Sequence, residues 1–281
     1  MYTEKHISDT AFLVNESRAR KLDVSQDIYA EHWVRPESRE RVRNLWDDFA
    51  REVYPHDDIE LAVRNRYFFE HLCELVKTGE KPVFVNLGAG FTSYPFLLDQ
   101  DILCIEVDFP HVIAYKLDRI KHLQEKGILP HRNLKLFPAD LCNADDRERL
   151  KAKLAAWVSG NSSYILLEGV SYYLPMPALL AIIEIVRDLQ SIGSIFAFDF
   201  WKPDLIRHPV FIQLQTFFAD RFGYEAYDYN LFDREFIESI ESYKLLEISD
   251  AIEQERIYAG TNVLADYSKI LPENYAVLKK C

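Results

Sequence analysis

Residues 83–90 read VFVNLGAG, a short apolar run that passes directly into two glycines. A short run of this kind is typical of a strand buried in a parallel sheet. Gly88 and Gly90 allow the backbone to turn tightly and to approach a ligand without a Cβ atom in the way. Because the chain contains only 9 glycines, the pair favours a ligand-binding turn, although a simple turn stays open as an alternative.

Strands and helices alternate from this point onward. The expected strands are 83–87, 102–105, 134–137, 164–167 and 194–200, and the expected helices between them are 111–126, 146–158 and 177–191. This alternation is typical of an α/β, doubly wound, mostly parallel sheet. Residues 243–248 and 255–264 are expected to add an antiparallel C-terminal hairpin. That addition favours the seven-stranded, Rossmann-like fold of class I methyltransferases.

The composition excludes several classes of function. Lys and Arg number 33 and Asp and Glu 45, so the net charge is −12, which argues against a nucleic-acid partner. No window of 18 apolar residues is present, so no membrane span is expected. The four cysteines lie far apart without a CxxC, which indicates no metal site. The N-terminus is polar, and the cysteines suggest no disulfide framework. Both features predict a location in the reducing cytoplasm.

Acidic residues follow three of the expected strands. Asp108 ends the second strand, twenty residues after Gly88, where a carboxylate can accept hydrogen bonds from a ribose diol. Asp140, next to Leu141, ends the third strand; it can accept from an adenine amino group or cap the following helix. Glu168 ends the fourth strand or caps the turn there. The carboxyl ends of parallel strands meet at one edge, so these residues together predict a nucleoside site.

Two arginines lie in the expected helix before the first strand. Arg64 and Arg66 cannot share a helix face at a spacing of two. One is therefore expected to point to solvent and one toward the strand ends, where a guanidinium would suit an amino-acid carboxylate. The spacing alone does not say which arginine does so.

These residues together resemble the leucine carboxyl methyltransferase family, which uses S-adenosylmethionine. The matching segments are Arg64 on its helix, N-L-G-A-G at 86–90, E-V-D-F-P at 106–110 with Lys116 after it, A-D-L at 139–141, E-G-V-x-x-Y-L at 168–174 and an Asp-x-Tyr element at 27–29. The resemblance covers roughly residues 10–200, in order. One departure is Phe69, which stands where bacterial members usually have an acidic residue.

The resemblance implies a contact for each part of the donor. The implied contacts are Arg64 for the methionine carboxylate, Glu168 for the ammonium, Gly88, Ala89 and Gly90 for the methionine and ribose, Asp108 for the ribose hydroxyls, and Asp140 and Leu141 for the adenine. A further basic contact would come from Arg18, Arg20 or Lys21. The product would be S-adenosylhomocysteine.

The expected reaction is methyl transfer to a carboxylate or hydroxyl oxygen of a small, largely apolar acceptor. A carboxylate acceptor is already ionised at pH 7 and needs no general base. A hydroxyl would benefit from one, for which His208 and Tyr173 are candidates. The expected acceptor contacts are Tyr173, Trp201 and Arg207. The many aromatic residues of 201–232 suit an apolar acceptor, or else they pack this segment onto the sheet.

The 281 residues are expected to form one methyltransferase domain. Its expected parts are an N-terminal helical cap (1–80), a donor-binding core (81–200), a helical acceptor lid (201–232) and a C-terminal helix with a strand hairpin (233–281). The sequence does not specify the acceptor or the oligomeric state.

Three other functions stay open. One is methylation of a protein's C-terminal carboxylate. Another is a nicotinamide-dependent oxidoreductase that uses the same glycines and Asp108, although it would lack the third glycine, at Ser93, and would leave Glu168 unexplained. The third is a donor-binding protein without catalysis.

Overall fold

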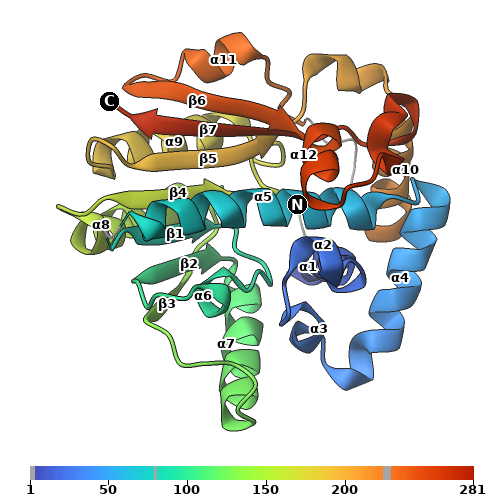
Figure 1. The fold of residues 1–281 in the computed structure, drawn as a ribbon, viewed down its shortest axis with the longest axis horizontal. Helices are drawn as coiled ribbons and strands as arrows, with labels where there is room; N and C mark the ends of the chain where they lie inside the picture. Colours follow the sequence, from blue (N-terminus) through green and yellow to red (C-terminus); the bar gives the residue numbers. More distant parts are fainter. Residues whose placement is uncertain (1–3, 79–80, 224–228) are drawn as a thin grey trace.

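A computed structural model describes residues 4–78, 81–223 and 229–281 of the chain (Figure 1). In chain order the elements are α1 (Glu4–Arg20), α2 (Leu22–Ser25), α3 (Ala30–Trp33), η1 (Pro36–Ser38), α4 (Arg39–Glu52), α5 (Asp57–Lys77), β1 (Val83–Leu87), α6 (Tyr94–Leu97), β2 (Cys104–Asp108), α7 (Pro110–Glu125), β3 (Leu134–Pro138), α8 (Ala144–Val158), β4 (Ser163–Leu167), α9 (Met176–Leu189), β5 (Ile195–Phe200), η2 (Pro203–Arg207), α10 (Pro209–Phe222), α11 (Arg234–Glu238), β6 (Tyr243–Asp250), α12 (Ala251–Tyr258), η3 (Val263–Ala265), η4 (Tyr267–Lys269) and β7 (Asn274–Lys280). The five strands and three helices predicted between residues 83 and 200 are confirmed, with ends that differ by a few residues.

The strands form one sheet in the order β3-β2-β1-β4-β5-β7-β6. Strands β1 to β5 pair in parallel, and β7 runs antiparallel to both β5 and β6. The inner strands β1, β2 and β4 are buried along their whole length, as expected for parallel strands covered on both faces. The predicted seven-stranded, mostly parallel sheet is therefore confirmed.

The prediction of a strand at residues 255–264 is wrong. This segment contains the end of α12 and the short helix η3, and the last strand is β7. The carboxylate of Asp250 accepts a hydrogen bond from the N–H of Glu253 and so starts α12 directly after β6. The two final strands are thus antiparallel neighbours, but a helical connection separates them in sequence.

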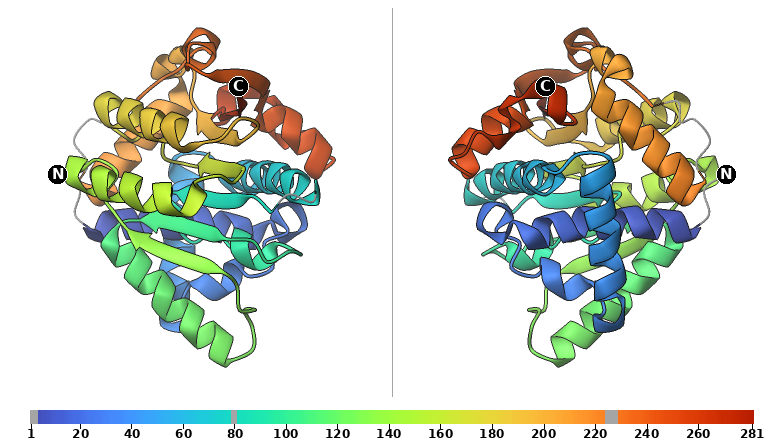
Figure 2. Two further views of the ribbon diagram at one scale, coloured as in Figure 1. Left: turned by 90° about the vertical axis from the view of Figure 1, so that its left-hand side faces the viewer. Right: turned by 90° about the vertical axis from the view of Figure 1, so that its right-hand side faces the viewer.

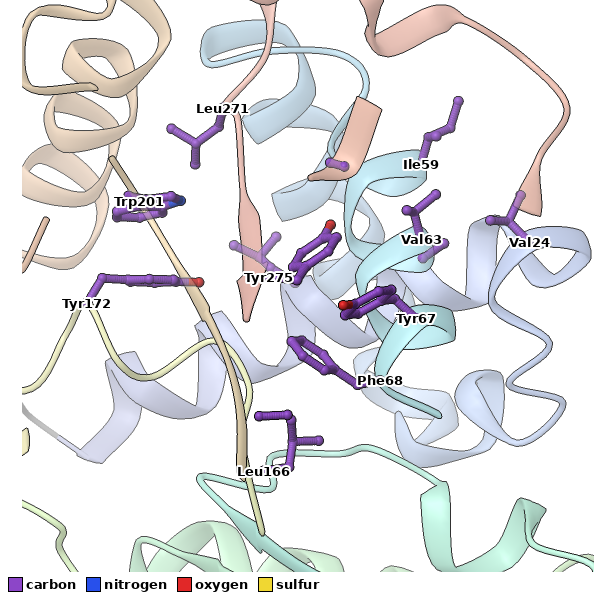
Figure 3. Close-up of a cluster of buried hydrophobic side chains, with 14 of the residues drawn as sticks. Val24, Ile59, Val63, Tyr67, Phe68, Leu166, Tyr172, Trp201, Leu271 and Tyr275 are labelled. Carbon is purple, nitrogen blue, oxygen red and sulfur yellow. The ribbon is translucent and has the colours of Figure 1, made fainter. Parts of the chain in front are cut away.

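Alternating side chains of the strands fill two separate apolar layers. Phe84 of β1 packs with the helix α5 on one face, in the cluster that Figure 3 shows in part. Val83 and Val85 point to the other face and pack against α8 and α9. The side-chain alternation of a strand therefore seats helices on both sides of the sheet.

The N-terminal helices gather at the end of the sheet where the parallel strands finish. Figure 1 shows α1 to α4 on that side together with α10, and the right-hand view of Figure 2 shows α1, α4 and α10 across it. The helix α1 packs on α5 and α4, and α10 packs on α4. Among the described residues, no helix is both long and apolar enough to cross a membrane.

Candidate functional site

The glycine turn after β1 lies against the end of β2. Leu87 is opposite Val107 in the strand register, which brings the turn level with Asp108. One carboxylate oxygen of Asp108 accepts the N–H of Gly90 at 2.7 Å, and the other accepts the N–H of Phe109 at 2.7 Å. Burial raises the pKa of Asp108, and these backbone donors act in the opposite direction. The structure therefore brings Asp108, for which the resemblance implies a contact with the ribose hydroxyls, next to Gly90 of the glycine turn.

The two glycines of the turn have different surroundings. Gly88 has a φ of +80°, and a Cβ atom there would overlap with a methyl carbon of Val170. Gly90 has a φ of +46°, and among the described residues its Cβ would find only the Cβ of Ala11 within 4 Å, at 3.9 Å. Ala89, between them, is buried. Gly88 is therefore required for packing, whereas Gly90 leaves open space that a ligand can occupy.

The end of β3 presents Asp140 next to the buried Leu141. The helix that follows is capped by Asn143, whose side chain accepts two backbone N–H groups of its first turn. Asp140 is half-buried, and its carboxylate accepts the N–H of Cys142 at 2.8 Å. Asn143, and not Asp140, therefore caps this helix. The adenine contact of Asp140 and Leu141 stays a prediction.

On the other side of β1, Arg64 of α5 reaches the end of β4. Its Nε donates to Glu168 at 3.2 Å, and its Nη1 donates to Glu273 at 2.7 Å and lies 3.1 Å from Asp199. All four side chains, which we call the Arg64 cluster, are at most 4 % exposed. Burial alone would lower the pKa of Arg64, but the surrounding carboxylates raise it well above its ordinary value. The guanidinium therefore stays charged.

The two arginines of α5 point in different directions, as their spacing predicts. Arg66 forms an ion pair with Glu70 one turn further along the helix. Only Arg64 joins the strand ends, so the structure places this arginine at the candidate site. Phe69, the departure from the family pattern, stacks on Tyr94 with ring centroids 5.7 Å apart. The hydroxyl of Tyr94 in turn donates to the carboxylate that ends β4.

Sequence reasoning missed two members of the Arg64 cluster. Asp199 lies in β5, and both of its carboxylate oxygens accept the N–H of Gly169 at 2.9 Å. Glu273 immediately precedes β7, and its own N–H donates to Glu60 at 2.9 Å. The register explains their position, because Asp199 pairs with the second residue of β7. No motif marks either residue, and only the pairing of β5 with β7 brings them together.

Burial raises the pKa of several carboxyl groups in and beside the Arg64 cluster. It raises the pKa of Asp57 and of Asp199 to about 6 and that of Glu273 to about 8. The pKa of Glu60 is also raised, again chiefly by burial. Tyr54 links two of these acids, since its hydroxyl lies 3.0 Å from Asp57 and 2.9 Å from Glu60. Three carboxyl groups contact the single guanidinium of Arg64, and one positive charge cannot neutralise all of them.

Among the three N-terminal basic residues, only Arg18 turns inward. It is 1 % exposed and donates to the carbonyl oxygen of Phe91, directly after the glycine turn, at 2.8 Å. Its Nε also donates to Asp27 at 3.2 Å, which explains the Asp-x-Tyr element. Arg20 lines a surface hollow of about 420 Å³ instead, and Lys21 is also partly exposed. The Asp-x-Tyr element at 27–29 is therefore the sequence feature that could have distinguished Arg18 from Arg20 and Lys21.

The predicted acceptor residues differ in exposure. Figure 3 shows Trp201 stacked on Tyr172. The ring centroids are 3.8 Å apart, and Trp201 is 1 % exposed. Tyr173 is half-buried, and its ring lies 6.1 Å from that of Trp201 and 5.6 Å from that of Tyr229. Arg207 is exposed at the end of η2. Trp201 thus packs the lid onto the sheet, and a contact between any of these predicted residues and an acceptor stays a prediction.

The candidate base His208 ties two parts of the chain together. One ring nitrogen, Nε2, lies 2.8 Å from the carbonyl oxygen of Tyr267, and the two rings meet edge to face. His208 is buried at the start of α10. Residues 224–228 of the predicted lid lie outside the described part of the chain.

Comparison with solved structures identifies the fold as that of class I methyltransferases. The crystal structure of a "putative methyltransferase" from Thermobifida fusca aligns with a TM-score of 0.60 at 16 % identity, covering 86 % of this chain and 88 % of the other. A DUF574 family protein from Streptomyces avermitilis aligns with a TM-score of 0.58 at 14 % identity, covering 91 % and 96 %. At such low identity the likeness concerns the fold alone.

The family is shown by the sequence itself. The profile of the leucine carboxyl methyltransferase family matches residues 9–187, and the chain belongs to that family. A Mycobacterium tuberculosis protein named "Putative S-adenosyl-L-methionine-dependent methyltransferase" is 28 % identical over 215 residues, 69 % of this chain and 66 % of the relative. A Streptomyces coelicolor protein of the same description is 30 % identical over 209 residues, 68 % and 64 % respectively. The chain therefore matches slightly less than two thirds of the length of these relatives, whose names specify the donor that the sequence predicts.

Proposed function

We propose that this chain is an S-adenosylmethionine-dependent O-methyltransferase acting on a small, largely apolar acceptor. The observation that carries the proposal is the meeting of Arg64 with Glu168, and of Gly90 with Asp108, at neighbouring strand ends. The names of the mycobacterial and streptomycete relatives support the donor. The family name, which refers to carboxyl methylation, supports an oxygen acceptor.

The donor fits the residues at these strand ends. Asp108 offers its carboxylate oxygens to two ribose hydroxyls. These hydroxyls would donate to it in place of, or in addition to, the two backbone N–H groups. Gly90 leaves space beside the turn that a side chain would fill. Arg64 offers a guanidinium to the donor's carboxylate, and Glu168 offers a carboxylate to its ammonium. Asp140 and Leu141 are the proposed adenine neighbours.

The donor supplies a methyl group on a sulfonium, which is already activated for transfer. The chain's own residues then have to hold the acceptor oxygen in line and exclude water. A carboxylate acceptor would be ionised without help from the protein. Tyr173 and Arg207 are the proposed acceptor contacts, while Trp201 is buried and would act by shaping the lid.

Isothermal titration calorimetry tests the donor. The proposal expects S-adenosylhomocysteine to bind and NAD not to bind; the reverse would indicate an oxidoreductase. Methyl transfer to a panel of carboxylic acids and phenols then tests the acceptor. A peptide that ends in leucine belongs in the same panel, because preferential methylation of that peptide would replace the small-molecule proposal by protein carboxyl methylation. Donor binding with no transfer to any acceptor would favour a binding protein.

A further inference from the structure

We propose that Asp199 and Glu273 are positioning residues that hold the Arg64 guanidinium so that its Nη2 faces the carboxylate of the bound donor. The inference rests on the proposed function and extends it to the last third of the chain. Both acids lie outside residues 9–187, the segment that matches the family. They therefore make β5 and the start of β7 part of the amino-acid end of the donor site.

The hydrogen bonds of Arg64 leave one nitrogen for a ligand. Nε donates to Glu168, and Nη1 donates to Glu273 and to the hydroxyl of Tyr172 and contacts Asp199. Among the described residues, Nη2 has no hydrogen-bond partner. It faces Gly169, where a Cβ atom would come within 3.2 Å of it. The guanidinium is thus bonded through Nε and Nη1, and Nη2, which packs beside Gly169, is the nitrogen left for a ligand.

Each acid that holds Arg64 is itself held. Asp199 accepts the N–H of Gly169 on both oxygens, so its carboxylate cannot rotate without losing these bonds. Glu273 is fixed at its backbone by Glu60 and at its carboxylate by the hydroxyl of Tyr172, 3.3 Å away. Tyr172 in turn stacks on the lid residue Trp201. A guanidinium held from two sides cannot swing onto one partner, and that rigidity is what a precise contact with a ligand requires.

A purely structural ion cluster is the competing explanation. It would contribute to folding, and its loss would affect every ligand equally. The positioning role differs because it concerns only ligands that carry an amino-acid end. S-adenosylhomocysteine has this end, and 5′-methylthioadenosine has the same adenosine without the carboxylate and the ammonium. Comparison of the two ligands therefore separates the explanations.

The experiment measures the affinities of both ligands by calorimetry for wild type, Glu273→Leu and Glu273→Gln. Leucine removes one of the three acceptors around Nη1 and leaves Asp199 and the hydroxyl of Tyr172, whereas glutamine keeps a carbonyl oxygen of similar reach. We expect Glu273→Leu to bind S-adenosylhomocysteine about tenfold more weakly or worse, the usual effect of one charged hydrogen bond. Its affinity for 5′-methylthioadenosine should stay within about twofold of wild type, and Glu273→Gln should recover most of the loss for S-adenosylhomocysteine.

Two further variants keep the test decisive. In Asp199→Asn the amide oxygen can still accept the N–H of Gly169, while the amide NH₂ cannot accept from Arg64, so the same ligand-selective loss is expected even if Glu273→Leu does not fold. Glu255→Gln is the matched control, because Glu255 is an equally buried acid that accepts the backbone N–H groups of Val263 and Leu264 and is not a member of the Arg64 cluster. We expect it to leave the ratio of the two affinities unchanged.

Several outcomes would overturn the inference. These are unchanged binding of S-adenosylhomocysteine by Glu273→Leu and Asp199→Asn, an equal loss for both ligands, or an equal effect of leucine and glutamine at position 273. Wild-type protein that binds both ligands with the same affinity would also overturn it, because the amino-acid end would then not be read. Wild-type protein that binds neither ligand would refute the proposed function itself, and the inference would fall with it.

Discussion

Two buried carboxylates, at the ends of the strands on either side of β1, are held in different ways. Asp108, which ends β2 beside the glycine turn, is held by the backbone N–H groups of Gly90 and Phe109. Glu168, at the end of β4, is held by the side chains of Arg64 and Tyr94. Backbone donors stay in place when a side chain is changed, whereas a guanidinium shared by three carboxylates couples all of them. We therefore expect substitutions on the adenosine side to act locally and those on the amino-acid side to act through Arg64.

The largest expected effect separates the two glycines of the turn. Gly88→Ala should lower the free energy of unfolding by about 2–5 kcal/mol, from overpacking against Val170 and from left-handed backbone strain. Gly90→Ala should cost only about 1–2 kcal/mol in stability, and Gly90→Val should lose donor binding to a greater extent than stability because its side chain fills the open space. Thermal unfolding and calorimetry measure both effects. If Gly90→Val unfolds while its remaining folded fraction binds normally, Gly90 is a structural turn only.

The next effect concerns the adenosine side alone. Asp108→Ala should weaken binding of S-adenosylhomocysteine and of 5′-methylthioadenosine alike, by about 1.5–3 kcal/mol. The control is Asp101→Ala, which also removes a carboxylate that accepts a backbone N–H, at 2.9 Å, but near the other end of β2. A folded Asp108→Ala protein with wild-type affinity for 5′-methylthioadenosine would contradict the ribose assignment and with it the comparison drawn above.

A smaller effect is the pH dependence of stability that Asp57 contributes. Burial raises its pKa from 3.8 to about 6, so the folded protein holds this proton more tightly than the unfolded chain does. Stability from this group is therefore fully present below about pH 4 and is lost as the pH rises toward about 6. In Asp57→Asn this loss is absent, and the stability of the variant relative to wild type should rise by about 1–3 kcal/mol between pH 4 and pH 7.

Denaturant unfolding at several pH values measures this difference. Asp58→Asn is the control, since Asp58 is the next residue of the same helix turn and pairs with Lys21 near the surface. A constant difference between Asp57→Asn and wild type across the range would show that the carboxyl of Asp57 titrates alike in both states. The prediction would then be wrong.

The adenosine side was predictable from the sequence for a geometric reason. Gly90 and Asp108 are 18 residues apart, one strand–helix–strand unit, so a short motif contains both. Arg64 meets Glu168 across 104 residues and Glu273 across 209. Predicting the second contact requires the order of the last strands. Because the sequence predicts the final strand at 255–264 and the structure has it at Asn274–Lys280, the sequence does not place Glu273 beside Arg64.

The lid shows a second limit of sequence reasoning. Aromatic side chains line an apolar ligand cavity or fill a core with equal ease, and composition does not separate the two. The structure buries Trp201 against Tyr172, while Tyr173 is half-buried beside it. Burial is a property of the folded chain, and it decides which of these neighbouring aromatic residues can reach an acceptor.

The smallest expected effect is that of Tyr173→Phe on methyl transfer. If the acceptor is a carboxylate, the tyrosine hydroxyl helps to position it and removes no proton, so we expect the single-turnover rate to fall only about two- to fivefold. The rate of wild type should also be nearly flat from pH 6 to pH 8, because a carboxyl with a pKa of about 4 is ionised throughout. Saturating donor at each pH keeps the titration of the Arg64 cluster out of the measured rate. A rate that rises tenfold per pH unit would instead indicate deprotonation of an acceptor hydroxyl, and a loss of several hundredfold in Tyr173→Phe would make this residue part of the proton transfer.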